Sequence, residues 1–260
     1  MQKRHTDRQR YFCELAHTSE KYFVPYINKF IDTTHSLSIL EIGCGDGGNL
    51  LPFAKLGHEV VGIDISSNRI KDAISFFEKE NAEAIFICAD ILKFDEYASH
   101  FDLIICHDVI EHIGNKQEML GRIEFFMKST GILFIAFPAW QMPFGGHQQI
   151  CHSRWISKLP YIHLLPNVLY KMLLSLGGET DECINELIDI KSTKTTIEHF
   201  EKLISRTSLD IIERRLYLIN PHYEIKFGLK PRILSKCLSK VLYLRDFFST
   251  SCFYILRKHR

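Results

Sequence analysis

Short apolar runs alternate with amphipathic stretches along the first half of the chain. Five runs rich in Ile, Val and Phe predict β-strands, at 38–43, 59–64, 84–90, 101–108 and 131–137. The amphipathic stretches predict helices, at 48–56, from Ser67 onward and at 117–128. Strands that alternate with helices pair in parallel and carry helices on both faces of the sheet. The strand runs are apolar at successive positions, as burial on both faces requires. The pattern therefore predicts a doubly wound α/β fold.

Two segments flank or interrupt this core, which spans residues 38–137. Residues 1–37 have a helical pattern with an aromatic surface, and this cap either packs on the edge of the domain or forms a lid over a cofactor. The regular alternation stops after the fifth strand. Residues 138–192 are too long for a simple strand-to-helix loop, so they predict an inserted subdomain.

The last segment, residues 193–260, is predicted to rejoin the sheet. Thr195 or Thr196 can cap a helix. A strand is predicted at Leu209–Ile219, and the run 252–258 predicts a final strand.

A glycine-rich turn joins the first predicted strand to the first predicted helix. Gly43, Gly45 and Gly48 satisfy the G-x-G-x-x-G spacing of dinucleotide-binding turns, in which glycine permits a sharp bend and the close approach of a ligand. Glu41 precedes them and, with Gly47, gives E-x-G-x-G-x-G. NAD would place an anionic pyrophosphate here, whereas S-adenosylmethionine (SAM) carries a cationic amino group and a cationic sulfonium. An acidic residue at this strand end favours the cationic ligand.

Two further acidic residues follow the second and third predicted strands. Asp64 can accept hydrogen bonds from both hydroxyls of a ribose, a role that NAD enzymes share. Asp90 can accept one from an adenine amino group, with Ile91 alongside the ring. Each carboxylate could instead cap the helix that follows it. Together with Glu41 they predict an adenosyl ligand across the carboxyl edge of the sheet, where doubly wound folds bind ligands.

Five motifs resemble, in order, those of the class I SAM-dependent methyltransferases: LEIGCGDG, VVGIDIS, AIFICADIL, FDLIICHDVIEHI and GILFIAFPAW. The resemblance covers Leu40–Phe137 and implies a Rossmann-like sheet of seven strands in the order 3-2-1-4-5-7-6, with the last strand antiparallel. It also implies an enzyme that transfers a methyl group from SAM, with His107 and Asp108 near the methionine end of the cofactor. The cofactor-binding residues that it implies are Glu41, Gly43, Cys44, Gly45, Asp64, Ile65, Asp90, Ile91, His107 and Asp108.

The methyl acceptor is expected to bind to the segment directly after the fifth strand, PAWQMPFGGHQQICHSRW. Its aromatic rings and hydrogen-bonding groups suit a sugar or another polar ring, whose faces stack and whose hydroxyls form hydrogen bonds. The segment loosely resembles methyltransferases of bacterial glycan biosynthesis clusters, which implies a small-molecule or glycan-precursor substrate. The predicted substrate-binding residues are Trp140, Phe144, His152 and Arg154.

A neutral histidine can take the proton of an oxygen acceptor near neutral pH. The candidates for this catalytic role are His147, then His112 in the Glu-His pair after the fourth strand, then His152. In the family that it resembles, the pair formed by Glu111 and His112 is often structural or faces the substrate. His147 and His152 could hold a metal, but no carboxylate cluster accompanies them. We therefore predict that no metal is bound and that the reaction is metal-free.

Bulk composition narrows the set of partners. The 260 residues are 46% hydrophobic and 24% charged, and the formal net charge of +1 provides no field that favours nucleic acid. No apolar run reaches the roughly 18 residues needed to span a bilayer, and the basic N-terminus lacks the apolar core of a signal peptide. A cytoplasmic protein is therefore expected. The eight cysteines are scattered, and we interpret them as small core residues in a reducing compartment.

The basic and apolar segment 222–248 allows two interpretations. We favour the solvated face of an amphipathic helix over a surface that docks on a membrane or on a lipid-linked substrate.

Two other functions stay open. An NAD-dependent oxidoreductase would need a catalytic Tyr/Lys pair or a histidine beside the nicotinamide, and the sequence shows no such motif. A non-catalytic SAM-binding protein is disfavoured by the intact cofactor motifs. Oxygen, nitrogen and carbon acceptors all stay open, as does the oligomeric state.

Overall fold

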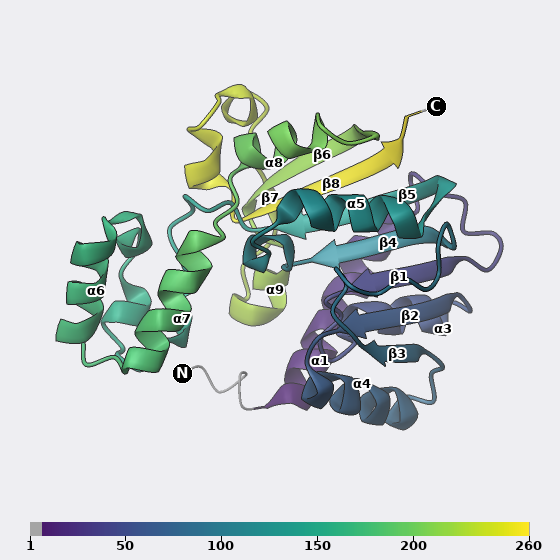
Figure 1. Ribbon diagram of the computed structural model, residues 1–260, viewed down its shortest axis with the longest axis horizontal. Helices are drawn as coiled ribbons and strands as arrows, with labels where there is room; N and C mark the ends of the chain where they lie inside the picture. Colours follow the sequence, from purple (N-terminus) through teal and green to yellow (C-terminus); the bar gives the residue numbers. More distant parts are fainter. Residues whose placement is uncertain (1–6, 260) are drawn as a thin grey trace.

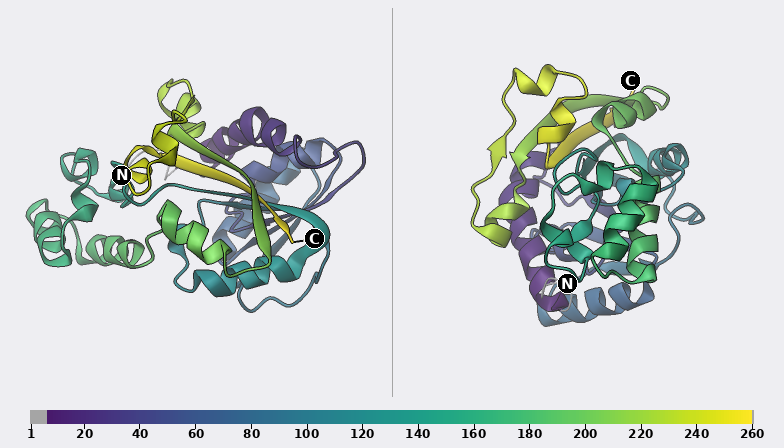
Figure 2. Two further views of the ribbon diagram at one scale, coloured as in Figure 1. Left: turned by 90° about the horizontal axis from the view of Figure 1, so that it is seen from above. Right: turned by 90° about the vertical axis from the view of Figure 1, so that its left-hand side faces the viewer.

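The computed structural model describes residues 7–259, which form one sheet with helices on both faces (Figures 1 and 2). Within these residues the sheet has eight strands in the order β3-β2-β1-β4-β5-β8-β6-β7. The first five pair in parallel, and β8 runs antiparallel to both β5 and β6. The strands are β1 Ser38–Ile42, β2 Glu59–Asp64, β3 Ile85–Cys88, β4 Phe101–His107, β5 Met127–Phe137, β6 Leu209–Ile219, β7 Arg232–Ile233 and β8 Ser251–Lys258.

The doubly wound order predicted from the sequence is confirmed. The predicted sixth and seventh strands are β6 and β8, and β8 is antiparallel as expected. The structure adds the two-residue strand β7, which extends the edge beyond β6. Residues 1–6 of the predicted N-terminal cap lie outside the described residues.

Two hydrophobic layers pack on opposite faces of the sheet, and successive strand residues supply them alternately. Leu40 and Ile42 belong to one layer, whereas Ile39 between them belongs to the other. The strands are therefore buried on both sides, which explains their unbroken apolar sequence. The first layer contains α5 (Lys116–Phe126) and α8 (Ile197–Ile204). The second contains α1 (Arg8–Thr18), a π-helical turn (Ser19–Phe23), α2 (Val24–Ile27), α3 (Leu51–Lys55) and α4 (Ser67–Lys79).

Local interactions set the helix boundaries. The Thr196 hydroxyl accepts a hydrogen bond of 3.0 Å from the His199 N–H and so caps α8, which identifies it as the capping residue of the two candidate threonines. The helix predicted over 117–128 ends earlier than expected. Met127 instead pairs with Phe101 as the first residue of β5, and its side chain is fully buried.

Residues 138–192 project from the sheet as a helical unit (Figure 1). Three 3-10 turns (Gln148–Ile150, Ile156–Lys158 and Ile162–Leu164) precede α6 (Asn167–Leu176) and α7 (Asp181–Ser192). The unit has a small core of its own, distinct from the two layers of the sheet. Its buried members are Cys151, Ile156, Ile162, Tyr170, Leu174, Cys183, Ile184 and Leu187.

The amphipathic helix favoured for residues 222–248 is wrong. The segment begins with the short helix α9 (His222–Phe227), which ends where Gly228 adopts a left-handed φ of 70°. The remainder consists of β7 and two 3-10 turns, at Leu238–Lys240 and Arg245–Phe248. The position of this segment is determined by its tertiary contacts with α1 and α8 rather than by a helical pattern of apolar residues.

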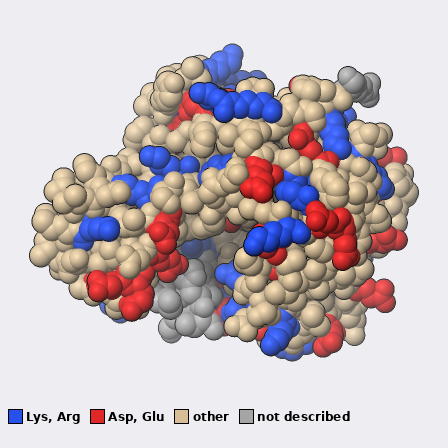
Figure 3. Space-filling view, viewed as in Figure 1, with Lys and Arg blue, Asp and Glu red and all other residues tan. Residues whose placement is uncertain are grey.

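Among the described helices, none has the length and apolar character needed to cross a bilayer. On the face shown in Figure 3, basic and acidic residues are interspersed. Such mixing differs from the basic stripe by which proteins bind nucleic acid.

Candidate active site

The glycine-rich turn leaves β1 with a backbone that requires glycine. Gly43 has a left-handed φ of 66°, and its N–H donates to the Ile63 carbonyl at 2.7 Å. A Cβ atom at this position would lie 2.5 Å from Cγ2 of Val109, so a side chain would clash. The turn is followed by a 3-10 turn (Gly48–Leu50) that leads into α3.

Two acidic side chains predicted to bind the cofactor lie at this turn. Glu41 is 1% exposed, and its Oε1 accepts a hydrogen bond of 2.7 Å from Asn49, while its Oε2 has no partner among the described residues. Burial raises the pKa of Glu41 to about 8. Asp64, which ends β2, accepts backbone N–H groups of Gly45 at 2.9 Å and Ser66 at 2.8 Å. Asp64 therefore holds the glycine turn in place, and each of its oxygens keeps a lone pair for a ligand.

The other predicted cofactor residues differ in how far their side chains are exposed to solvent. Asp90 accepts the Leu92 N–H at 3.1 Å within a turn, and in the described part of the chain no helix directly follows it that it could cap. Ile91 is buried in the core, whereas Ile65 is 74% exposed just after β2. The Cys44 side chain is buried in the layer that contains α1, so only its backbone can meet a ligand.

Helix α1 packs directly on the glycine turn. A Cβ atom at Gly48 would lie 2.7 Å from the Phe12 carbonyl oxygen, and the Arg8 guanidinium forms an ion pair of 2.6 Å with buried Asp46. Two other α1 side chains, Tyr11 and Leu15, line the cleft described next. Helix α1 thus packs in a hydrophobic layer of the sheet and also supplies part of the cleft wall, so both interpretations of the cap stay open.

A cleft lies beside the carboxyl ends of β4 and β5. The residues that line it are Tyr11, Leu15, His107, Asp108, Glu111, Pro138, Met142, Phe144, His147, Gln149, Asn220, His222, Tyr223, Lys226 and Thr250. Two of them, Asp108 and His147, hold left-handed φ angles of 53° and 56°. Such strain in non-glycine residues occurs most often at functional sites.

Glu111 and His147 line this cleft, and His112 lies against both. One ligand atom from each lies within 4.8 Å of those of the other two, and the two imidazole rings meet edge to face with centroids 5.0 Å apart. Glu111 is 5% exposed, and neither of its carboxyl oxygens has a hydrogen-bond partner within the described part of the chain. The three groups could hold a divalent cation, an arrangement that the sequence analysis did not foresee.

Burial controls the protonation of this cluster. It raises the pKa of Glu111 well above its usual range, with repulsion from Asp108 as a second cause. It lowers the pKa of His147 to about 4 and also lowers that of His112. At neutral pH both imidazoles are therefore uncharged, and each has a nitrogen lone pair that can accept a proton or a metal ion.

Several predicted substrate-binding residues do not reach the cleft. Phe144 lines it, but Trp140 is buried with its indole edge-on to His163 at a centroid distance of 4.7 Å. Arg154 is exposed on the projecting unit, and His152 lies there beside Glu179. Next to His147, fully buried Gln148 donates to the carbonyls of Pro143 and Leu159 and so ties this segment to the rest of the insert. The prediction that Trp140, His152 and Arg154 contact a substrate in this cleft is not supported.

Sequence reasoning missed the wall formed by α9. Asn220, His222, Tyr223 and Lys226 line the cleft although they lie far along the chain from the motifs. α9 is tied to the N-terminal helices, since His222 Nδ1 lies 3.0 Å from the Thr18 hydroxyl. The only sequence signal was the polar and aromatic composition of this segment.

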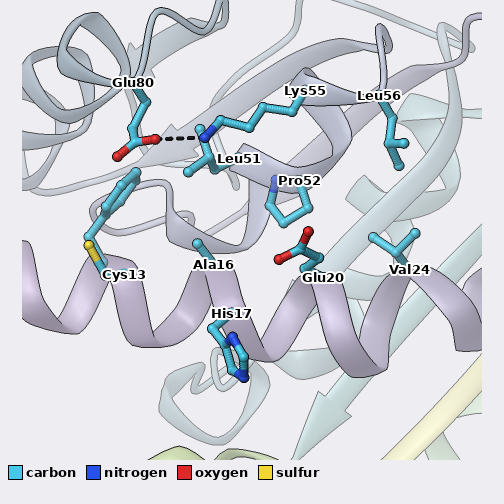
Figure 4. Close-up of a pocket in the computed structure, with 11 residues that line it drawn as sticks. Cys13, Ala16, His17, Glu20, Val24, Leu51, Pro52, Lys55, Leu56 and Glu80 are labelled. Carbon is cyan, nitrogen blue, oxygen red and sulfur yellow. Dashed lines mark hydrogen bonds and ion pairs between the residues drawn. The ribbon is translucent and has the colours of Figure 1, made fainter.

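A second hollow lies between α1 and α3 (Figure 4). At about 420 Å³ it is larger than the cleft, which measures about 150 Å³. Its ends are marked by Cys13 and Val24, and a Lys55–Glu80 ion pair of 2.6 Å closes one side. None of the predicted catalytic or cofactor residues lines it, so we place the chemistry in the cleft.

The doubly wound sheet, with antiparallel β8 inserted between β5 and β6 and a glycine turn after β1, is the arrangement expected of a class I methyltransferase. Residues 33–173 match the family model described as "Methyltransferase domain", which is more than half of the chain. The chain therefore belongs to this methyltransferase family, and the class inferred from the motifs is confirmed.

Relatives and solved structures agree with this assignment. The chain is 34% identical over 108 residues to a ubiquinone biosynthesis O-methyltransferase of Rhodopseudomonas palustris (strain BisB5), with 42% of each chain covered. It is 28% identical over 122 residues to the Rickettsia prowazekii (strain Madrid E) enzyme of the same name, with 47% of this chain and 48% of the relative covered. The match thus spans less than half the length of these curated relatives.

Two solved structures show the same fold at lower identity. The plantazolicin methyltransferase BpumL, in complex with a pentazolic desmethylPZN analog and SAH, has a TM-score of 0.59 at 20% identity, with 98% of this chain and 88% of that chain covered. The magnesium protoporphyrin IX methyltransferase of Synechocystis PCC 6803, with bound SAH, has a TM-score of 0.55 at 14% identity, with 94% and 84% covered.

Proposed function

We propose that this chain transfers a methyl group from SAM to a hydroxyl oxygen of a small polar acceptor bound in the cleft. The observation that carries the proposal is the cluster of Glu111, His112 and His147, of which Glu111 and His147 line a cleft at the carboxyl edge of the sheet. Doubly wound folds bind their ligands at this edge. The curated relatives are named O-methyltransferases, which supports oxygen as the acceptor atom.

The residues at the glycine turn fit SAM. Glu41 offers a buried carboxyl oxygen without a partner in the described residues, which suits a cationic amino group. Asp64 and Asp90 offer acceptors for the ribose hydroxyls and the adenine amino group. When bound, SAM supplies a methyl group that its sulfonium has already activated for displacement.

The chain's own contribution is to position the acceptor and to accept a proton. Phe144 and Tyr223 offer aromatic surfaces, and Asn220 and Gln149 offer hydrogen-bonding groups, a combination that supports a sugar or glycan-precursor hydroxyl. An oxygen that gains a methyl group becomes strongly acidic. Neutral His147 can therefore take its proton despite a pKa of about 4.

The negative charge of Asp108 favours the protonated form of His147 and so assists this step. Helices α1 and α9 supply walls that keep bulk water from the transferring methyl group.

We further propose that the chain is organised in four parts. Residues 38–137 and 193–260 form the methyltransferase core, 1–37 form the cap, and 138–192 form the insert, which contributes Phe144 and His147 to acceptor binding. The independent small core of the insert supports this division.

The test uses the purified chain and SAM labelled on the methyl group. Transfer of label to one member of a panel of sugars, sugar nucleotides and phenols is expected, and mass spectrometry of the product locates the methylated oxygen. Heat stabilisation by SAM and S-adenosylhomocysteine but not by NAD separates this function from an oxidoreductase. Stabilisation by NAD alone would overturn the proposal, and SAM binding without transfer across the panel would favour a non-catalytic protein.

A further inference from the structure

A second cluster of potential metal ligands lies inside the insert, away from the cleft. Cys151, Glu179 and Cys183 are all buried, and one ligand atom from each lies within 4.8 Å of those of the other two. Nδ1 of His152 lies 3.4 Å from Glu179 Oε2, and the His152 side chain is 60% exposed. None of these residues lines the cleft.

We propose that the insert binds a structural zinc ion through Cys151, Glu179 and Cys183, with His152 beside the fourth position. Zinc in proteins prefers a tetrahedral set of sulfur, nitrogen and carboxylate ligands at about 2.0–2.3 Å. Such bond lengths place neighbouring ligand atoms about 3.3–3.8 Å apart. The ligand atoms here lie within 4.8 Å of one another, so binding requires shifts of about 1 Å or less. Two sulfur ligands favour zinc over magnesium or calcium, which prefer oxygen.

The surroundings of Glu179 resemble the outer shell of a metal site. Its two oxygens accept the backbone N–H groups of His152 and Ser153, each at 2.9 Å, so the carboxylate is held facing the two thiols. A divalent cation would offset the charge of this carboxylate and of the thiolates that it creates by displacing their protons. The exposed His152 ring gives the ion a route from solvent.

A metal ion at this position would stabilise the insert, which has only a small hydrophobic core. Only eight hydrophobic residues form its buried core, and α6 leaves Val168 and Leu176 each 78% exposed. Units of this size usually need a disulfide or a metal to hold them together. Cys151 lies early in the insert, whereas Glu179 and Cys183 flank the start of α7. The ion would cross-link these two parts and so fix the loop that begins at His147.

The test measures metal content, so it does not depend on the proposed methyl transfer. The full chain is produced in zinc-supplemented medium and purified with a phosphine reductant, and its zinc content is determined by mass spectrometry. We expect about one zinc per chain, as for a single closed site. Cys183→Ser should lose this zinc. Cys237→Ser, at an exposed cysteine elsewhere, and His147→Ala, in the cleft cluster, should keep it.

A second measurement covers the case in which Cys183→Ser does not fold. The wild-type chain is stripped of metal and loaded with Co²⁺. Thiolate-to-cobalt charge-transfer absorption together with intense tetrahedral d–d bands is expected. Absence of both zinc and these bands would overturn the proposal. Loss of the zinc in His147→Ala would also overturn it. So would a disulfide between Cys151 and Cys183 in the wild-type protein, if its reduction did not allow the chain to bind zinc.

Discussion

The imidazole of His147 meets that of His112 edge to face, with ring centroids 5.0 Å apart and planes at 85°. The two histidines come from different parts of the fold. His112 ends a 3-10 turn after β4, and His147 precedes a 3-10 turn of the insert. Their contact joins the core to the insert at the cleft, and it makes the insert part of the proposed catalytic site.

Replacing His147 by alanine should separate catalysis from cofactor binding. If His147 accepts the acceptor proton, turnover should fall by about 10²–10⁴ while SAM affinity and the melting temperature stay near wild type. His35→Ala, at an exposed histidine outside the cleft, serves as the control. Steady-state kinetics, calorimetry and thermal unfolding on the same samples check this. A joint loss of stability, SAM affinity and turnover would show a structural role instead and would leave His112 as the next candidate.

Asp64→Asn should weaken SAM binding. A hydrogen bond to a charged group contributes about 1.5–3 kcal/mol, so the dissociation constant should rise by roughly 10- to 150-fold. Because Gly45 and Ser66 donate to different oxygens of Asp64, asparagine can accept from only one of them, so thermal unfolding of the variant is measured beside its SAM affinity. Asp95→Asn, whose carboxylate is 83% exposed, is the control. Equal affinities for Asp64→Asn and wild type, measured by calorimetry, would remove Asp64 from the cofactor site.

Glu41→Gln should change the pH dependence of stability. The pKa of Glu41 rises from 4.5 in the unfolded chain to about 8 in the fold, so between these values the folded state binds more protons. The contribution of Glu41 to the free energy of unfolding is therefore fully present below pH 4.5 and is lost as the pH rises through 8. In the variant, the free energy of unfolding should no longer fall with pH over this range. At pH 8 it should exceed that of the wild type by on the order of a few kcal/mol.

The check is chemical denaturation of both proteins, without SAM, from pH 5 to pH 8.5. The same substitution should weaken SAM binding, because the cationic amino group loses its acidic partner. Parallel stability profiles for the two proteins would contradict the assigned protonation of Glu41.

Arg245→Met should destabilise the fold. The Arg245 side chain is 2% exposed and donates to Glu198 at 3.0 Å and to Glu201 at 2.8 Å, which fastens the C-terminal segment to α8. Removing the cation leaves two partly buried carboxylates without this partner. Because both are partly exposed to solvent, the expected loss is about 1–3 kcal/mol. Urea denaturation measures it, with exposed Lys240→Met as the control. A loss no greater than that of the control would exclude the anchoring role.

Added Mg²⁺ or Mn²⁺ should leave turnover unchanged. The sequence predicts a metal-free reaction, whereas Glu111, His112 and His147 are close enough to share an ion. Initial rates are compared with and without the added cations, on protein whose zinc content is known and constant. A rate increase that saturates with the cation and disappears in Glu111→Gln would assign a metal-dependent reaction to the cleft.

The sequence by itself determined the core of the fold and the glycine turn at which we propose that the cofactor binds. The strands were readable because burial on both faces leaves an unbroken apolar run, as in Leu103–Cys106 of β4. The glycine turn was readable because Gly43 and its neighbours need backbone angles that other residues resist. Both signals lie in short stretches of sequence, so they can be recognised without knowing which residues pack against them in the fold.

Only the tertiary structure decided which side chains meet in the cleft. Tyr11, His147 and Tyr223 come from the N-terminal helix, the insert and α9, and no local pattern links them. The same holds for Trp140 and His152, which lie near His147 in sequence. The Trp140 carbonyl lies 2.8 Å from Nε2 of buried His163, and the His152 N–H donates to buried Glu179. Residue type indicates what chemistry a side chain can perform, whereas contacts between distant parts of the chain decide where it is performed.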